Sequence, residues 1–397
     1  MDAVTLGMAK ADARKRMKWA APKPIVVATR SRTGNLRQAT IPAESLSAGT
    51  STQHATRLRH FATANAHSPQ LLYGDNAMGE NGPNPITVKG AFEYSAGAIV
   101  PAFFNGARSA VIQPGGLLLS DPVPAEVIKA AFFRSRQMVS VSTLGEKWPI
   151  GALINTSVGD GGAATDTVDG GTMPDNNGAN VFCPTAIIGI PYEPTVALYI
   201  SGDSIMQGVG DASAEPTTDG GWVCRSLNNQ VGYINAARAG ETAQQYVPGN
   251  NRRLGRWQLA RYCTHALVGY GINDVKGDRT IAQIQADLLV IWNGLAAMGL
   301  DVFQATLTPV TTGGNYTTPE TQVKQSTARE NVRLGINAWI RSKPAPLKGF
   351  VDVADAVETT RDSGIWKNSY TSDGTHPNAT GAAAMATAAN LPSRFTL

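Results

Sequence analysis

Hydrophobic and polar positions follow two different patterns along the chain, and the change falls near residues 191–194. Between about residues 86 and 190, short apolar runs alternate with polar residues and are broken by glycine and proline, as in 86–94 and 109–113. Alternation with a period of two is typical of half-buried strands. This part of the chain therefore predicts an all-β sandwich or jelly-roll domain.

From residue 193 onward, strand-like apolar runs alternate with helical patterns. We expect strands at 196–200, 233–236, 266–270, 302–308 and 350–353, and helices at 281–298, 319–342 and 378–389. In the first helix Ile281, Ile284, Leu288 and Ile291 fall on one face, as in an amphipathic helix. The alternation predicts an α/β fold, with a mostly parallel sheet covered by helices on both faces.

The first eighty residues have a weaker pattern. Leu6, Ala9, Ala13 and Met17 fall at helical spacing between charged residues, so we expect a short basic helix over residues 1–19. Residues 20–85 are rich in Ser, Thr, Ala, Asn, Gln and Pro and predict an extended, loop-heavy segment. The expected domains are 1–80, a helix and extended segment; 81–192, the β domain; and 193–397, the α/β domain.

Length and charge narrow the class of protein. The 397 residues are 42% hydrophobic, enough for more than one core, and only 16% are charged, with a net charge of +4. This charge is too thinly spread for a nucleic-acid footprint. The basic cluster at 10–18 is interpreted as a solvated helix face, with a charged partner as the alternative. An oligomer could form through this N-terminal region.

Neither a membrane span nor a secretory signal is read from the sequence, so a soluble chain is expected. Cys183, Cys224 and Cys263 are odd in number and widely spaced, which favours free thiols over disulfides or a zinc site. The 41 glycines, with many Thr, Asn and Ala residues, are common in extracellular and virion proteins, and such a role is expected on composition alone.

No metal site and no cofactor are expected. The loops at 159–164 and 169–178 are rich in Gly, Asp and Asn and could hold a cation, but ordinary turns are the preferred interpretation. Three of the five histidines, His54, His60 and His67, have no companions that suggest chemistry. His265 begins a predicted strand and is interpreted as structural.

Candidate chemistry begins at Ser204. An apolar run from residue 196 ends abruptly in the small-residue turn Gly202-Asp203-Ser204, which places a hydroxyl at the carboxyl edge of the predicted sheet. By itself Gly-Asp-Ser is ordinary turn chemistry. Its interpretation depends on the residues that come after the other predicted strands.

Three later motifs lie just past a predicted strand or just before the last helix. They contain Gly240 in 238–242, Asn273 and Asp274 in 271–274, and Asp373 and His376 in 373–377. Strands of a parallel sheet end at one edge, so the three motifs and the Ser204 turn would meet there. In isolation, Asn273-Asp274 could cap a helix and Asp373-His376 could be a turn with a surface imidazole.

Together these motifs supply every part that a serine ester hydrolase needs. Ser204 is the candidate nucleophile, His376 the base, and Asp373 the carboxylate that fixes the imidazole tautomer. The backbone N–H groups of Ser204 and Gly240 and the side-chain amide of Asn273 are candidate oxyanion donors. Glycine suits position 240 because the backbone must approach the substrate closely. We expect Asp203 to brace its turn and Asp274 to cap the following helix.

In these residues the chain resembles the SGNH hydrolases of the GDSL family, whose blocks contribute Ser, Gly, Asn and His in that order. The resemblance covers about residue 196 to the end; the blocks around Asn273 and His376 are specific and the one around Gly240 is a weak match. The resemblance implies a flavodoxin-like three-layer α/β/α fold and metal-free hydrolysis of carboxylic esters through an acyl-enzyme.

The sequence favours a small-acyl substrate on a glycan. The segment 208–220 after Ser204 is polar, unlike the apolar lid of a long-chain lipase. Aromatic residues near the blocks suit sugar rings or core packing equally well: Trp222, Tyr246, Trp257, Trp366 and Tyr370. We therefore expect an esterase that removes O-acetyl groups from a polysaccharide. The alternatives are a lipase or arylesterase acting on small or lipid esters, and a glycan-binding, phage-type structural protein with a vestigial site.

Overall fold

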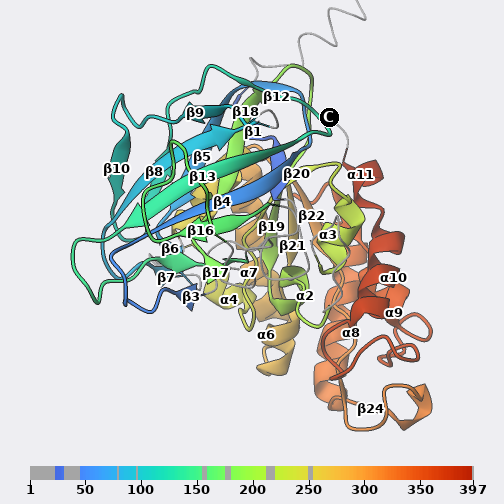
Figure 1. Ribbon diagram of the computed structural model, residues 1–397. Coiled ribbons are helices and arrows are strands. Elements are labelled where there is room, and N and C mark those ends of the chain that lie inside the picture. Colours follow the sequence, from blue (N-terminus) through green and yellow to red (C-terminus); the bar gives the residue numbers. More distant parts are fainter. Residues whose placement is uncertain are drawn as a thin grey trace, which may run out of the picture.

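The structure is a computed structural model, shown in Figure 1. It describes residues 23–30, 45–77, 80–94, 97–153, 159–174, 180–211, 220–248 and 254–395. The basic helix expected over residues 1–19 lies outside these ranges. No helix among the described residues is both long enough and apolar enough to cross a membrane.

A five-stranded parallel sheet organises the C-terminal half. Its strands are β19 (Ala197–Gly202), β20 (Gly232–Asn235), β21 (His265–Gly269), β22 (Asp301–Ala305) and β25 (Gly349–Val351), in the order β20-β19-β21-β22-β25. All six residues of β19 are buried, as expected for a parallel strand covered on both faces. The strand order is the 2-1-3-4-5 order of flavodoxin-like sheets, and the order reverses between β19 and β21.

Helices contact one another in two groups around this sheet. One group is α3 (Trp222–Leu227), α9 (Val353–Val357), α10 (Ala379–Ala389) and α11 (Leu391–Arg394), and the other includes α4 (Ala243–Tyr246), α6 (Ile272–Lys276), α7 (Ile281–Ala297) and α8 (Thr327–Arg341). Shorter elements are α2 (Ser204–Gln207), α5 (Leu254–Leu259) and η4 (Ala260–Tyr262). The predicted face of α7 is confirmed at Ile284, Leu288 and Ile291, which are fully buried.

The predicted helix at 319–342 is wrong in its first third, residues 319–326. Residues there form the short turn η5 (Pro319–Thr321) and strand β24 (Val323–Lys324), which pairs with β23 (Thr311–Thr312). Ser326 then caps α8 by accepting the N–H of Arg329, so the helix begins at Thr327. The backbone of Trp366 holds Gln322 through two hydrogen bonds of 3.0 and 3.1 Å, which favours the extended path over a helix.

Two antiparallel sheets make up most of the N-terminal half. One contains β1 (Ile25–Val26), β18 (Ala186–Pro191), β5 (Ala66–Gly74), β11 (Leu117–Leu119) and β12 (Glu126–Val127). The other contains β10 (Ser109–Ile112), β8 (Ile86–Glu93), β13 (Phe132–Ser140), β4 (Gln53–Ala62), β16 (Gly161–Ala163), β2 (Ala28–Arg30) and β9 (Ile99–Pro101). Short pairs are β3 (Ser45–Leu46) with β14 (Pro149–Ile150), β6 (Asn76–Ala77) with β7 (Glu80–Asn81), and β15 (Ala152–Leu153) with β17 (Asn180–Val181).

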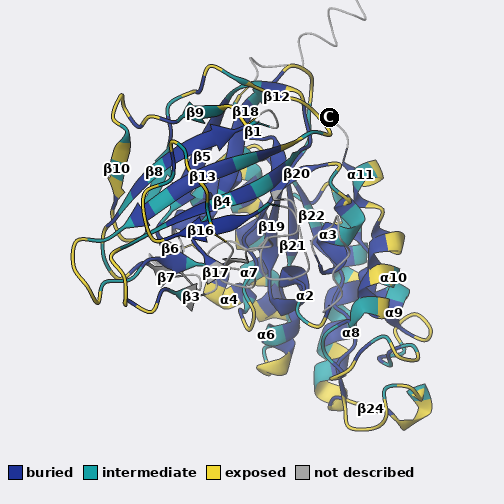
Figure 2. Cartoon of the chain, in the orientation of Figure 1, coloured by how far each residue is buried: buried dark blue, intermediate teal, exposed yellow. Residues whose placement is uncertain are grey.

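The two larger sheets pack against each other. A Cβ at Gly90 of β8 would lie 2.6 Å from the Tyr73 hydroxyl and 2.8 Å from Leu71 Cδ1, both on β5 of the other sheet. Figure 2 shows the buried interior of this half running into the parallel sheet. The N-terminal half therefore contains the antiparallel sheets that a β-rich domain requires. The more specific expectation of a sandwich or jelly roll stays a prediction.

The expectation of a loop-heavy segment over residues 20–85 is wrong. Strands β4 and β5 span ten and nine residues of it and pair with β13 and β18. In β4 the inward residues Leu58 and His60 alternate with Arg57 and Arg59, which lie half-buried on the other face. The expectation rested on the composition of the whole segment, and this local alternation of buried and half-buried residues was overlooked.

The first strands connect the two halves of the chain. Strand β1 contacts β19 and β20, and β2 contacts β20, the edge strand of the parallel sheet. The fit is close, because a Cβ at Gly232 would lie 2.6 Å from the Val26 carbonyl oxygen. Thr29 Oγ1 also donates to Asn229 Oδ1 at 3.1 Å. The first strands therefore pack against the edge strand of the parallel sheet.

Candidate active site

The Ser204 turn joins β19 to the single-turn helix α2. Asp203 is the N-cap, and its Oδ1 accepts the N–H of Ile205 at 2.9 Å. Met206 packs so closely over the end of the sheet that a Cβ at Gly202 would lie 2.3 Å from its Cγ. The small residue before Asp203 is therefore required by packing, and Ser204 sits at the carboxyl edge with 7% of its surface exposed.

A continuous chain of hydrogen bonds links Ser204, His376 and Asp373. Ser204 Oγ lies 2.8 Å from His376 Nε2, and His376 Nδ1 lies 2.6 Å from Asp373 Oδ2. An ionised carboxylate only accepts, so the proton of the neutral ring lies on Nδ1 and Nε2 is left to accept the serine O–H. The structure thus brings together the three side chains that were predicted to form the triad.

The loop that carries His376 is held from several sides. Asp373 Oδ1 accepts the N–H groups of Thr375 and His376, each at 2.8 Å, and the Trp366 indole N–H donates to the Gly374 carbonyl at 3.1 Å. Partial burial alone would raise the pKa of Asp373, but these hydrogen bonds and the one from the His376 ring hold its pKa well below the ordinary value. Asp373 is therefore ionised at neutral pH and can stabilise the His376 ring when the ring becomes protonated.

The candidate oxyanion donors lie on three segments that follow β19, β20 and β21 and are bonded to one another. The Arg238 N–H donates to the Gly202 carbonyl at 2.8 Å, and the Ala239 N–H donates to Gln207 Oε1, on the Ser204 helix, at 2.7 Å. Asn273 Nδ2 donates to the Glu241 carbonyl at 3.0 Å, which leaves its second N–H available. Within the described part of the chain, the N–H groups of Ser204 and Gly240 donate to no protein acceptor.

The backbone conformation gives a second reason for glycine at position 240, beside the predicted approach to a substrate, which stays a prediction. A Cβ there would meet nothing within 4 Å, so no close approach within the protein requires glycine. The backbone instead has a φ of +77°, in the left-handed region that side chains with a Cβ rarely adopt. The open space beside this exposed loop leaves room for a substrate.

Asn273 and Asp274 do not cap the helix that contains them. Gly271 is the N-cap of α6 and makes no side-chain cap. Asp274 accepts the N–H of Ala243 at 2.8 Å, at the start of α4, and burial raises its pKa. The carboxylate therefore fixes the segment that follows Gly240, whereas Asp203 braces its own turn as predicted.

A model of the GDSL-like lipase/acylhydrolase family matches residues 200–384. These residues are a GDSL-like lipase/acylhydrolase domain. The matched segment contains Ser204, Gly240, Asn273, Asp373 and His376. No curated protein matches the chain.

Several solved structures are similar to about half of this chain. A GDSL-like lipase from Bacteroides thetaiotaomicron is 18% identical, covering 48% of this chain and 84% of its own, with a TM-score of 0.34. A carbohydrate acetylesterase from Sinorhizobium meliloti is 14% identical, covering 51% and 100%, with a TM-score of 0.35. A psychrotrophic esterase from a Pseudoalteromonas species is 15% identical, covering 48% and 93%, with a TM-score of 0.34.

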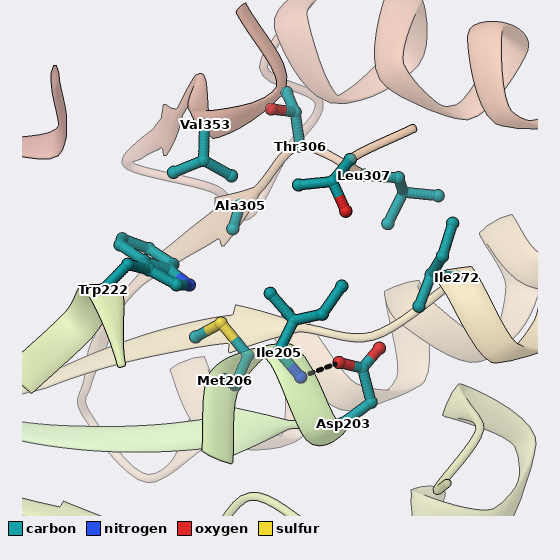
Figure 3. A pocket seen from close by; sticks show the side chains of 11 residues that line it. Asp203, Ile205, Met206, Trp222, Ile272, Ala305, Thr306, Leu307 and Val353 are labelled. Carbon is teal, nitrogen blue, oxygen red and sulfur yellow. Dashed lines mark hydrogen bonds between the residues drawn. The ribbon is translucent and has the colours of Figure 1, made fainter. Parts of the chain in front are cut away.

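A small cavity lies beside the nucleophile turn of the GDSL domain (Figure 3). Its volume is about 20 Å³, and Asp203, Ile205, Met206 and Leu307 are among its lining residues, whereas Ser204 is not. A space of this size accommodates about one water molecule, not an acyl chain. Burial raises the pKa of Asp203 to about 7, although the Ile205 N–H favours its ionised form. The cavity therefore lies among the residues that pack beneath the nucleophile turn and is not a substrate pocket.

Most aromatic residues near the blocks of the GDSL domain form its core. Trp222, Tyr246, Trp257 and Trp366 are all at least 97% buried, so core packing was the correct interpretation for them. Only Tyr370 is half-buried, with Lys367 Nζ 5.9 Å from its ring centre. A sugar-stacking role for the other four is excluded by their burial.

No group of three or more His, Cys, Asp or Glu side chains in the described ranges is arranged to hold a metal ion. In the Gly-rich loops, Asp160 accepts the Arg59 N–H at 2.7 Å, and Asp169 pairs with Lys89 at 2.6 Å and with Arg108. These two carboxylates contact protein cations and donors. His265 and His60 are buried and bonded to hydroxyls, at 2.8 Å each.

The sequence did not reveal several residues that position the His376 segment and the Gly240 loop. Gly210 touches the His376 segment, and Thr371 Oγ1 donates to the His376 carbonyl at 2.8 Å. Glu241 and Arg256 form a buried pair next to Gly240. The two glycines of Gly208-Val-Gly210, so close to the nucleophile, were a signal in the sequence for the role of Gly210. A buried arginine such as Arg256 has no sequence signature.

Proposed function

We propose that the GDSL domain is a serine esterase that removes O-acetyl groups from a polysaccharide through an acyl-enzyme. The observation that carries this proposal is the hydrogen-bonded chain from Ser204 Oγ through His376 to Asp373, at 2.8 and 2.6 Å. Such a chain turns a weakly nucleophilic hydroxyl into one that attacks an ester carbonyl.

In the proposed acylation step, Ser204 Oγ bonds to the acetyl carbonyl carbon while His376 Nε2 takes the serine proton. Asp373 stabilises the imidazolium that forms. The negative charge on the former carbonyl oxygen is received by the N–H groups of Ser204 and Gly240 and the free amide N–H of Asn273. His376 then protonates the departing sugar oxygen as its bond to carbon breaks.

The second step returns the enzyme to its starting state. A water molecule gives a proton to His376 Nε2 and bonds through its oxygen to the acetyl carbon. The same donors receive the second tetrahedral oxyanion. When the bond to Ser204 Oγ breaks, the serine recovers its proton from His376 and acetate leaves.

The exposure of the site supports a polymeric substrate with a small acyl group. The Asp373 side chain is 53% exposed and that of His376 21%, and Gly240 borders open space. Among the described residues, the large apolar side chains that are exposed do not come from the segments that carry Ser204, Gly240, Asn273 or His376. A lipase site is expected to offer an apolar surface for long chains. The glycine-rich composition supports a setting outside the cell or on a virion.

The competing functions are a lipase or arylesterase, and a glycan-binding protein whose site no longer turns over. To distinguish them, acetate release is measured from a panel of acetylated polysaccharides, beside hydrolysis of p-nitrophenyl esters of two to sixteen carbons, with wild type and Ser204→Ala. The proposal expects Ser204-dependent acetate release and a preference for the shortest esters. Preference for long chains with no acetate release favours the lipase, and equal rates for both proteins favour the binder.

A further inference from the structure

An ion pair is fully buried behind the Gly240 loop. Arg256 and Glu241 are each only 1% exposed, and the guanidinium binds the carboxylate in a bidentate manner, Nη1 to Oε1 at 3.0 Å and Nη2 to Oε2 at 2.9 Å. Tyr270 Oη also donates to Glu241 Oε2 at 2.7 Å. Burial raises the pKa of Tyr270 well above its ordinary value, so it remains a donor.

The far side of Arg256 is anchored in the core of the domain. Its Nε donates to the Ala236 carbonyl, at the end of β20, at 3.1 Å. The guanidinium lies 4.9 Å from the centre of the Tyr246 ring, which in turn stacks on Trp257 and bonds to the Tyr199 hydroxyl at 2.6 Å. Arg256 is therefore fixed by contacts with a strand end and with buried aromatic side chains.

This pair leads directly to two candidate oxyanion donors. Glu241 follows Gly240 in the chain, and its N–H donates to the Arg238 carbonyl at 3.2 Å, so a fixed Glu241 holds closed the turn that contains the Gly240 N–H. The Glu241 carbonyl accepts Asn273 Nδ2 at 3.0 Å, which orients the amide of that side chain as well. Glu241 thus connects the backbone donor of the Gly240 loop to the side-chain donor of α6.

Stability alone is a poor reason for such a pair. Removing two charges from water costs free energy that their attraction often only offsets, so apolar residues of similar size would stabilise the core equally well. A bidentate carboxylate and guanidinium do supply a fixed geometry. In an oxyanion site, displacement of a donor by a fraction of an ångström costs rate.

We propose that Glu241 and Arg256 are positioning residues that hold the Gly240 N–H and the Asn273 amide in place for the oxyanion. This inference rests on the proposed esterase function. It predicts that loss of the pair lowers kcat and leaves KM nearly unchanged, because the donors act on the transition state more than on the bound ester.

The test compares Glu241→Gln, which keeps the shape of the side chain, with Glu93→Gln as the matched control. Glu93 is another buried carboxylate, bound by Arg57 and Arg136 in the antiparallel sheet, away from the GDSL domain. With p-nitrophenyl acetate we expect Glu241→Gln to lower kcat about 10- to 100-fold with KM within about twofold. Glu93→Gln should keep the wild-type kcat. Tyr270→Phe, which deletes one hydrogen bond to Glu241, should fold even where Glu241→Gln does not, and should lower kcat about threefold or more.

A second measurement separates positioning from support of the fold. If Glu241 acts through Asn273, the effect of Glu241→Gln on kcat should shrink at least threefold in an Asn273→Ala background. The inference would be overturned if Glu241→Gln lowered kcat by the same factor with and without Asn273→Ala. It would also be overturned if Glu241→Gln lowered the melting temperature but left kcat per folded molecule at the wild-type value. Equal rates for wild type and Ser204→Ala would instead overturn the esterase proposal and this inference with it.

Discussion

Gly210 lies directly against the segment that carries His376. A Cβ at Gly210 would lie 2.9 Å from His376 Cβ and 2.6 Å from the Pro377 carbonyl oxygen. Real Cβ atoms do not approach so closely, so a side chain at Gly210 would force either its own loop or the His376 segment to shift. A glycine just beyond the nucleophile helix is thus part of the structure that aligns the base.

Gly210→Ala is therefore expected to lower kcat for p-nitrophenyl acetate by at least about tenfold. Its φ of +95° adds a strain of roughly 1–2 kcal/mol to the folded state. Gly299→Ala is the matched control, because Gly299 has a φ of +87° with nothing within 4 Å of an added Cβ. Both variants should lose the stability that the backbone strain costs in urea unfolding, Gly210→Ala should lose more because of its clash, and only Gly210→Ala should lose rate. Equal activity in the two variants would show that this contact does not align His376.

Asp203→Asn should change how stability depends on pH. Burial raises the pKa of Asp203 to about 7, so between pH 4 and 7 the folded protein keeps a proton that the unfolded chain has lost. Stability contributed by this group therefore falls as the pH rises through that window and is level above it. The asparagine keeps an acceptor for the Ile205 N–H without the charge. From pH 5 to pH 8, the variant should gain about 2–3 kcal/mol relative to wild type. If the free energy of unfolding changed with pH in the same way for the variant and the wild type, the prediction would be contradicted.

Asn273→Ala is expected to lower kcat roughly 10²–10³-fold with a small change in KM, because an oxyanion donor acts mainly in the transition state. Lys276→Ala is the control, since Lys276 is exposed on the same short helix. Steady-state kinetics with p-nitrophenyl acetate supply both constants. A loss confined to KM would instead assign Asn273 to ground-state binding.

Asp373→Asn should preserve the fold and lower kcat by roughly 10²–10⁴-fold. An amide in place of the carboxylate presents a donor or an uncharged acceptor to His376 Nδ1, so the ring loses both its fixed tautomer and its counter-charge. The melting temperature checks the fold and kcat checks the role. Retention of more than a tenth of the wild-type rate would remove Asp373 from the proposed triad.

Much of the site was readable from the sequence because its parts are short and ordered. Ser204, Asn273 and His376 each follow or precede a strongly patterned element, and parallel strands bring such positions to one edge. Strand β4 was missed because the Ser-, Thr-, Ala-, Asn-, Gln- and Pro-rich composition of residues 20–85 outweighed the local alternation around Leu58 and His60. The start of α8 was misplaced because the pairing of Gln322 with Trp366 is a tertiary contact. The Arg256–Glu241 pair was invisible for the same reason, since only the fold brings residue 256 to the Gly240 loop.

Covalent labelling of Ser204 tests the central claim most directly. The protein is treated with a fluorophosphonate, and its intact mass and its peptides are measured beside those of Ser204→Ala. The account predicts one adduct per chain, on Ser204, with loss of p-nitrophenyl acetate hydrolysis in proportion to labelling and no adduct on the variant. Labelling at another residue, or a Ser204→Ala protein that hydrolyses the ester as fast as wild type, would contradict it.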